Sequence, residues 1–492
     1  MENNPPRNTG GSVAKNMAWS VVERVTSQFL HTVLSIILAR LLLPEDYASV
    51  ALVTVFVNLA GTVVTSSFAS ALIFDREQSP RRYSTGMFAI LMATGILYAA
   101  LFIAAPWIAA YYDDPAVLNI TRVMSLLFVL QGVHSILMAY VSKNMLFKKT
   151  YKATLIGAVS GAAVAFTLAY TGNGVWALVF LPMMETAISS VILWKSIGFK
   201  LVWEFDWPYV KFMVKYCTKF VLVDLLNSLY TSLNSLIIAK KHSKADLAYY
   251  SKSYNLPQML LGSVNTAVSK VLFPVFSEAK SDLDLIRQKL RYGIRLSCFV
   301  LMPLMAGLMM VSQEAVVFLF TENWIGMVPY LQIMCALWAF QPVQICAVQA
   351  FKAVGKGDDY LRLEILKKVL SLALLFSLLF LVNDPIAVAW AAFAAQLVSC
   401  IVNIPYLKKV FHYTVRQQLA DLGIPIALCA VMSAAIYGVG FLVGNLVVRL
   451  FVKVFVGVVA YVAVAAVTGN ESFYVLLETV TKGKIKRKQK AD

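Results

Sequence analysis

Long apolar segments separated by short polar gaps follow one another along the whole of this chain. Each segment is about 20 residues long, the length of an α-helix that crosses a bilayer. Transmembrane β-strands are about half as long and alternate apolar with polar residues, whereas these segments are apolar on all sides. The pattern therefore predicts helical spans at residues 17–41, 47–72, 84–106, 117–141, 151–171, 175–195, 216–239, 247–275, 293–312, 328–351, 363–382, 386–406, 419–441 and 444–467.

Basic residues are distributed unevenly among the gaps. Thirty-two of the 43 Lys and Arg residues lie in every second gap or in the two tails, whereas the intervening gaps hold acids such as Asp113 and Asp114. Because Lys and Arg are enriched in cytoplasmic loops, both ends of the chain are expected in the cytoplasm. One external gap, at residues 240–244, breaks the rule with three lysines.

An internal repeat explains this exception. Ser35-Ile-Ile-Leu-Ala-Arg40 aligns with Ser235-Leu-Ile-Ile-Ala-Lys240, and at the same offset of 200 residues Asp46 matches Asp246. Lys240 is therefore the counterpart of Arg40 at the end of the first helix. Six helices per copy is an even number, so both copies insert with the same orientation, and a substrate site is expected between two lobes related by a pseudo-twofold axis.

The predicted fold is an all-α polytopic membrane protein of about 14 transmembrane helices, with two six-helix lobes and two C-terminal helices. Its parts are expected to be a cytoplasmic tail (1–16), an N-lobe (17–196), a cytoplasmic interfacial linker (197–215), a C-lobe (216–407), two further helices (408–467) and a basic cytoplasmic tail (468–492).

Composition agrees with a membrane protein. The chain is 59% hydrophobic, so it has too little polar surface to cover a soluble globule. Its net charge of +17 is spread over short cytoplasmic gaps, where topology and anionic headgroups account for it, and no nucleic-acid partner is expected. The six cysteines lie in apolar segments without a CxxC pair, so neither a metal site nor a disulfide framework is expected.

Polar residues within the first span recur at spacings of three and four, which places them on one face of a helix. The offset of 200 gives the seventh span a corresponding face. Ionisable groups among lipid tails are costly, so such residues face protein or water. We expect a central cavity lined by Arg24, Gln28, His31, Asn58, Lys219, Asn227, Thr231, Asn234 and Lys270, with Asp224 as counter-ion and candidate carrier of a proton or another cation.

Two alternatives remain open for these residues. The neutral ones can instead hydrogen-bond to one another between packed helices, as Ser, Thr and Asn often do. Lys219 and Lys270 lie near span ends, where their ammonium groups can extend to the interface. No catalytic motif, cofactor site or Gly-rich phosphate loop is recognisable, and the external gaps are too short for a catalytic domain. The polar residues therefore favour transport over catalysis.

Several local sequences resemble the Wzx-type oligosaccharide flippases, in particular the colanic-acid and teichuronic-acid exporters of the multidrug/oligosaccharidyl-lipid/polysaccharide (MOP) superfamily. The resemblance covers the whole chain. It is carried by Ala39-Arg-Leu-Leu-Leu-Pro-Glu-Asp-Tyr47, Lys143-Asn-Met-Leu-Phe-Lys-Lys149, Gly172-Asn-Gly-Val-Trp-Ala-Leu-Val179, Leu272-Phe-Pro-Val-Phe-Ser277 and Asn323-Trp-Ile-Gly-Met-Val-Pro-Tyr-Leu-Gln332. One departure is Ala48, where the family usually has Gly.

The resemblance implies a cationic cavity that opens alternately to either side. It also implies an undecaprenyl-diphosphate-linked oligosaccharide as substrate, moved across a bacterial inner membrane. Arg24 is then the best-placed partner for the diphosphate. The expected surroundings are membrane lipids and, as partners, a polysaccharide polymerase and export machinery, with the protein itself a monomer. The alternatives are a multidrug or cation antiporter of the same architecture and, from a different class, a membrane polysaccharide polymerase or glycosyltransferase.

Overall fold

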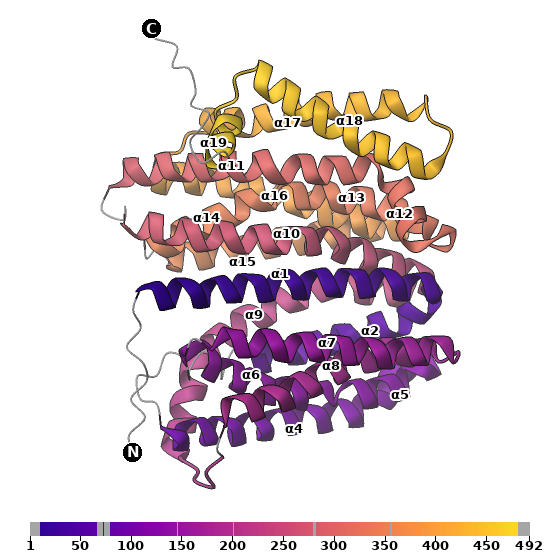
Figure 1. The fold of residues 1–492 in the computed structure, drawn as a ribbon, viewed down its shortest axis with the longest axis vertical. Coiled ribbons are helices and arrows are strands. Elements are labelled where there is room, and N and C mark those ends of the chain that lie inside the picture. Colours follow the sequence, from indigo (N-terminus) through magenta and orange to yellow (C-terminus); the bar gives the residue numbers. More distant parts are fainter. Residues whose placement is uncertain are drawn as a thin grey trace. The chain divides into compact units, whose positions relative to one another are not determined.

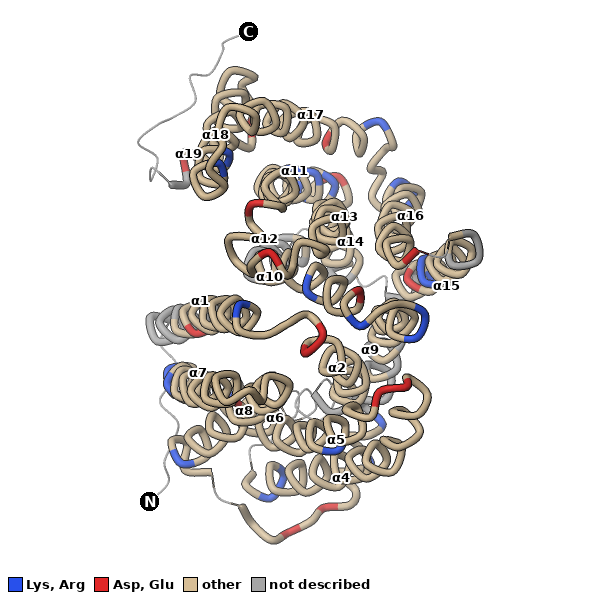
Figure 2. The backbone as a smooth tube through the Cα atoms, turned by 90° about the vertical axis from the view of Figure 1, so that its right-hand side faces the viewer, with Lys and Arg blue, Asp and Glu red and all other residues tan. Residues whose placement is uncertain are grey.

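The computed structural model describes residues 10–65, 72, 79–144, 146–199, 201–278, 282–354, 357–382 and 384–480. These residues form helices and no β-strand, which confirms the predicted all-α fold for the described part of the chain. The chain divides into two compact units, residues 1–248 and 249–492. Within each unit, long helices pack side by side (Figure 1). Along the backbone, Lys, Arg, Asp and Glu residues occupy short stretches between longer stretches without charged residues (Figure 2).

The first unit consists of helices from the N-terminal half of the chain. It contains α1 (Gly10–Leu41), α2 (Pro44–Thr65), α4 (Pro80–Tyr111), α5 (Pro115–Met124), α6 (Leu127–Asn144), α7 (Phe147–Tyr170), α8 (Gly174–Ile197) and α9 (Trp207–Lys241). Helix α10 (Lys244–Glu278) begins in this unit and continues into the second. Proline in the first turn, preceded by Ser79, Asp114 or Asp206 as N-cap, fixes the starts of α4, α5 and α9.

The second unit consists of the rest of α10 and the helices that follow it in the chain. Its elements after α10 are α11 (Leu283–Met310), α12 (Ser312–Phe320), the 3₁₀ helix η1 (Glu322–Met327), α13 (Val328–Ala339), α14 (Gln341–Ala353), α15 (Gly357–Leu381), α16 (Pro385–Phe411), α17 (Val415–Gly440), α18 (Leu446–Val467) and α19 (Glu471–Val480).

Every predicted span overlaps one described helix or two consecutive helices, and residues 66–71 of the span at 47–72 lie outside the described residues. The span at 117–141 is broken at Ser125 and Leu126, and the span at 328–351 is broken at Phe340. In the described part of the chain, nine segments are long and apolar enough to cross a membrane. The total of fourteen spans and the lobe boundaries at 196 and 216 stay predictions.

The repeat is visible in local structure. Helix α1 ends at Leu41 and α2 starts at Pro44, while α9 ends at Lys241 and α10 starts at Lys244, each 200 residues later. The carboxylate of Asp46 accepts a hydrogen bond from the backbone N–H of Leu43 at 3.1 Å. Asp246 accepts one from the N–H of Ser243 at 3.3 Å. The same side chain thus caps the same turn in both copies.

Helices α7 and α8 pack closely because two glycines lie four residues apart on α7. A Cβ atom at Gly157 would lie 2.7 Å from the backbone oxygen of Glu185, and one at Gly161 would lie 2.9 Å from that of Leu181. Small residues at this spacing allow the backbones of transmembrane helices to approach. This approach brings Glu185, in the middle of α8, close to the helices that pack on α7.

Candidate functional site

Half of the predicted cavity residues have described side chains. The side chains of Arg24, Lys219, Asp224, Asn227 and Lys270 lie outside the described part of the structure. The other five belong to the first unit. Asn234 is buried, Gln28 and His31 are half-buried, and Asn58 and Thr231 are exposed. The backbone carbonyl oxygens of Gln28 and Asn58 accept hydrogen bonds from the hydroxyls of Thr32 and Thr62.

Polar faces of α2 and α9 meet within the first unit. The hydroxyl oxygens of Thr62 and Ser228 lie 2.9 Å apart, and the hydroxyl of Thr231 donates to the carbonyl oxygen of Ser228 at 3.0 Å. Thr62 and Ser228 thus satisfy each other by a hydrogen bond between packed helices.

His31 contacts an acidic residue that the sequence analysis did not select. Its Nε2 atom lies 3.1 Å from Oε1 of Glu185, whose side chain is 14% exposed. Helix α7 packs against both α1 and α8, and Figure 2 shows the three helices as neighbours. A lone acid within the apolar span 175–195 was a usable signal, because such residues are rare among lipid tails.

The His31–Glu185 pair lies at mid-depth of the helices. His31 is ten residues before the end of α1 and Glu185 eleven residues after the start of α8. These two helix ends are neighbours, since a Cβ atom at Gly174 would touch the side chain of Leu42. At 1.5 Å per residue the pair is about 15 Å from that end, which is half of the bilayer core of about 30 Å.

A second histidine lies on α6. Nδ1 of His134 is 3.1 Å from the hydroxyl oxygen of Ser190, which donates to the carbonyl oxygen of Thr186 at 2.6 Å. Ser190 is little more than one turn from Glu185 on α8. In the described part of the chain, no group of three or more His, Cys, Asp or Glu side chains is arranged to hold a metal ion.

The exceptional lysines at 240–244 pair with acids of another gap. Nζ of Lys240 lies 3.3 Å from Oδ2 of Asp113, and Nζ of Lys244 lies 2.8 Å from Oδ2 of Asp114. The hydroxyl of Ser49 also donates to Asp114, at 2.6 Å. Burial raises the pKa of Asp114, but the hydrogen bonds from Lys244 and Ser49 outweigh this effect and hold that pKa below its ordinary value.

This depressed pKa has a consequence for stability. The Asp114 ion pair stabilises the fold above the ordinary Asp pKa of about 3.9 and loses this contribution as the pH falls through the lower folded-state value. We expect Asp114→Asn to lower the midpoint of thermal unfolding at neutral pH, and the difference from wild type to disappear in strong acid. Circular dichroism of the detergent-solubilised proteins measures the unfolding midpoint at neutral pH and in acid.

Asp113→Asn is the matched control. Its carboxylate is 86% exposed, and exposed ion pairs contribute about 0–1 kcal/mol, so we expect little change at any pH. An Asp114→Asn effect that persisted unchanged in acid would show that the ion pair is not its cause.

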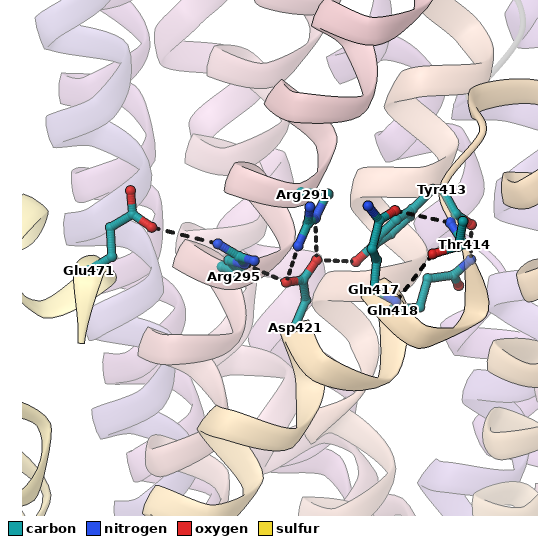
Figure 3. Close-up of polar contacts among 8 residues, drawn as sticks. All are labelled: Arg291, Arg295, Tyr413, Thr414, Gln417, Gln418, Asp421 and Glu471. Carbon is teal, nitrogen blue, oxygen red and sulfur yellow. Dashed lines mark hydrogen bonds and ion pairs between the residues drawn. The ribbon is translucent and has the colours of Figure 1, made fainter. Parts of the chain in front are cut away.

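The second unit contains a buried carboxylate between two arginines (Figure 3). Asp421 of α17 has a fully buried side chain and accepts hydrogen bonds from Arg291 at 2.8 and 3.1 Å and from Arg295, both on α11. The hydroxyl of Tyr413 donates to it at 2.7 Å. On the other side of Arg295, its Nη1 atom lies 3.6 Å from Oε2 of Glu471 on α19. A pocket of about 540 Å³ opens beside this cluster, and no predicted cavity residue lines it.

Two further polar clusters lie in the second unit. Glu314 of α12 is buried against Lys453 at 2.6 Å and Arg449 at 2.9 Å, both on α18. Lys367 of α15 donates to Gln344 of α14 at 3.1 Å, and Asn403 of α16 donates to the same oxygen at 2.7 Å. These clusters connect helices of one unit.

Comparison with protein families decides what kind of protein this is. The model of a family described as "Polysaccharide biosynthesis protein" matches residues 37–329, which is more than half of the chain. The chain belongs to this family. The resemblance to Wzx-type exporters found in the sequence is thereby confirmed.

Known relatives agree with this result. The succinoglycan biosynthesis transport protein ExoT of Rhizobium meliloti (strain 1021) is 23% identical over 346 residues, which are 70% of each chain. The lipopolysaccharide biosynthesis protein WzxC of Escherichia coli (strain K12) is 22% identical over 438 residues, covering 86% of this chain and 87% of that protein. The prediction of a transporter rather than an enzyme is confirmed.

Solved structures identify the fold. The lipid II flippase MurJ, in an inward closed conformation, matches with a TM-score of 0.74 at 13% identity over 95% of this chain and all of that chain. An inward-facing multidrug resistance transporter of the MATE family, within the MOP superfamily, matches with a TM-score of 0.64 at 14% identity over 78% of this chain and 97% of that one. The chain thus shares its fold with these transporters, and its long apolar helices are those of a multi-pass membrane protein.

Proposed function

We propose that this protein flips undecaprenyl-diphosphate-linked oligosaccharide repeat units across the bacterial inner membrane, as a step in making an exopolysaccharide of the colanic-acid type. The observation that carries the proposal is the family match over residues 37–329. It is supported by relatives named for succinoglycan transport and lipopolysaccharide biosynthesis, and by a fold shared with a lipid II flippase. Transport proceeds by alternating access of a central cavity, with the lipid tail in the bilayer.

The membrane orientation follows from the basic gaps. Lys and Arg residues in alternate gaps and in the tails support an orientation with both termini in the cytoplasm. The external gap at 240–244 fits this orientation because Lys240 and Lys244 are compensated by Asp113 and Asp114, which belong to another predicted external gap. The opposite orientation would expose most of the basic residues to the outside.

The predicted cavity residues have complementary roles in this proposal. Arg24, together with Lys219 or Lys270, holds the diphosphate through charge-assisted hydrogen bonds. Gln28, His31, Asn58, Asn227, Thr231 and Asn234 offer hydrogen bonds to sugar hydroxyls. Asp224 is the counter-ion of Arg24 in the empty cavity.

A MATE-like drug or cation antiporter is the second candidate, favoured by the structural match to a transporter of that family. That function calls for a cavity dominated by acids, whereas the predicted stripe here contains Arg24. Drug susceptibility of a deletion strain separates the two: unchanged susceptibility favours the flippase, and increased susceptibility favours the antiporter.

Deletion of the gene tests the proposal in cells. We expect a lipid-linked oligosaccharide to accumulate in the inner leaflet, because its synthesis continues while its passage stops. Mass spectrometry of extracted lipids identifies the intermediate, and its accessibility to an added glycosidase in spheroplasts reports the leaflet. Re-expression of the wild-type gene is the control. Normal surface polysaccharide without accumulation would contradict the proposal.

A further inference from the structure

A protonatable pair lies at mid-membrane depth in the first unit, and the proposed function gives it no role as a pair. His31 and Glu185 come from α1 and α8, two helices that α7 separates along most of their length. Nε2 of His31 and Oε1 of Glu185 are 3.1 Å apart. The side chain of His31 is 40% exposed and that of Glu185 is 14% exposed. The pair is therefore neither fully enclosed nor at a helix end, where its charge would be hydrated by bulk water.

The charge of this pair depends on one proton. With neutral imidazole and ionised carboxylate the pair carries a charge of −1, and at mid-bilayer depth an uncompensated charge is costly. Binding of one proton gives an imidazolium–carboxylate or an imidazole–carboxylic acid pair, each with a net charge of zero. Histidine is the side chain whose ordinary pKa lies closest to physiological pH, so this exchange is accessible under cellular conditions.

The surrounding helices provide few charges that would fix the pair in one state. Helix α7 has no ionisable side chain from Ala153 to Ala169. The other elements packed against α8 carry few charged groups: His134 and Lys143 on α6, Arg122 on α5, and Glu45 and Asp46, followed by Tyr47, at the start of α2. Elsewhere on α1 the sequence has Lys15, Glu23, Arg24 and Arg40. Arg122 contacts the ring of Phe102, and Asp46 caps the start of α2.

We propose that His31 and Glu185 form a proton-binding site that takes up a proton from water on one side of the membrane and releases it to the other during each transport cycle. The proton is bound and returned unchanged, so no other reactant is needed. This inference rests on the proposed function, because only alternating access exposes a mid-membrane site to each side of the membrane in turn. It transfers the role of proton carrier from Asp224 to this pair.

The first test measures protonation without transport. Infrared difference spectroscopy compares the purified wild-type protein in alkaline and mildly acidic buffer. We expect a protonated carboxyl band or a histidine signal that Glu185→Gln and His31→Gln each alter. Glu45→Gln, which removes an exposed carboxylate at the start of α2, is the matched control and leaves the difference spectrum of the pair unchanged. Identical spectra for wild type and Glu185→Gln would overturn the proposal.

The second test measures coupling in proteoliposomes that contain the lipid-linked oligosaccharide extracted from the deletion strain. A difference of one pH unit shifts the equilibrium of a transport step coupled to one proton by a factor of about ten. We expect this gradient to alter the flipping rate of wild type and of Glu45→Gln several-fold, and to leave Glu185→Gln and His31→Gln unaffected. Two variants are used so that the outcome does not depend on the folding of one.

The outcomes separate the two proposals. Wild-type flipping that ignores the gradient, or a Glu185→Gln protein that keeps the full response, would overturn the proton site and leave the flippase in place. Absence of any wild-type flipping would count against the flippase, while the infrared comparison would still decide whether the pair binds a proton.

Discussion

Arg24→Ala is expected to reduce polysaccharide export to the level of the deletion strain. Arg24 lies about seven residues into the first predicted span, roughly 10 Å from its cytoplasmic boundary, so it can meet a diphosphate that enters from the cytoplasmic leaflet. A hydrogen bond to a charged group contributes about 1.5–3 kcal/mol, which corresponds to a loss of about 10- to 150-fold in affinity for each bond removed.

Complementation of the deletion strain measures this effect. Surface polysaccharide is quantified together with the amount of each variant in the membrane. Arg40→Ala is the matched control. Arg40 lies in the last turn of the same helix, at the end opposite to the cytoplasmic boundary near Arg24. Arg24→Lys is expected to keep part of the export activity, because lysine retains the positive charge but cannot form the bidentate hydrogen bonds of a guanidinium. Full export by an Arg24→Ala protein present at normal levels would exclude this role.

Asp421→Ala is expected to be the most destabilising single substitution in the second unit. The carboxylate is fully buried and receives hydrogen bonds from two arginines and a tyrosine. Removal of one partner from a buried ion pair costs about 3–5 kcal/mol. The arginines are about 26% and 35% exposed, so they recover some hydration and the lower end of this range applies.

Thermal unfolding in detergent measures this prediction. Glu471→Ala is the control: its carboxylate is 64% exposed and lies 3.6 Å from Arg295, so its removal is expected to change stability by less than about 1 kcal/mol. Asp421→Asn keeps the shape of the side chain and removes its charge, so its unfolding midpoint is expected to lie between those of Asp421→Ala and Glu471→Ala. An unfolding midpoint for Asp421→Ala equal to that of wild type would show that the cluster does not stabilise this unit.

Helix positions were largely predictable because the apolar segments have the length of a bilayer and end at Pro, Gly and charged residues. The repeat was predictable because its register is preserved through a tight turn, where Asp46 and Asp246 cap equivalent helix starts. The break at Ser125 was not predictable, since no Gly or Pro marks the end of a helix there, whereas Pro342, two residues after Phe340, was a usable signal for the second break.

Side-chain partners were harder to predict than helices. The stripe on the first helix selected His31, but its partner depends on the rotation of α8 and on the close approach of α7 at Gly157, which the sequence of one segment does not specify. The spacing of Arg291 and Arg295, four residues apart on one helix face, was a usable signal for a shared anionic partner. The identity of that partner, Asp421, required the packing of α11 on α17.

Flipping by the purified protein is the most direct measurement. Proteoliposomes are prepared with the lipid-linked oligosaccharide of the deletion strain in both leaflets, and the outer-leaflet sugars are removed with a glycosidase. If the protein is a flippase, wild-type vesicles will expose the lipid-linked oligosaccharide of the inner leaflet to the glycosidase. Protein-free vesicles and vesicles with Arg24→Ala will retain about half of the original oligosaccharide. Retention of that half by vesicles with the folded wild-type protein would contradict the proposed function.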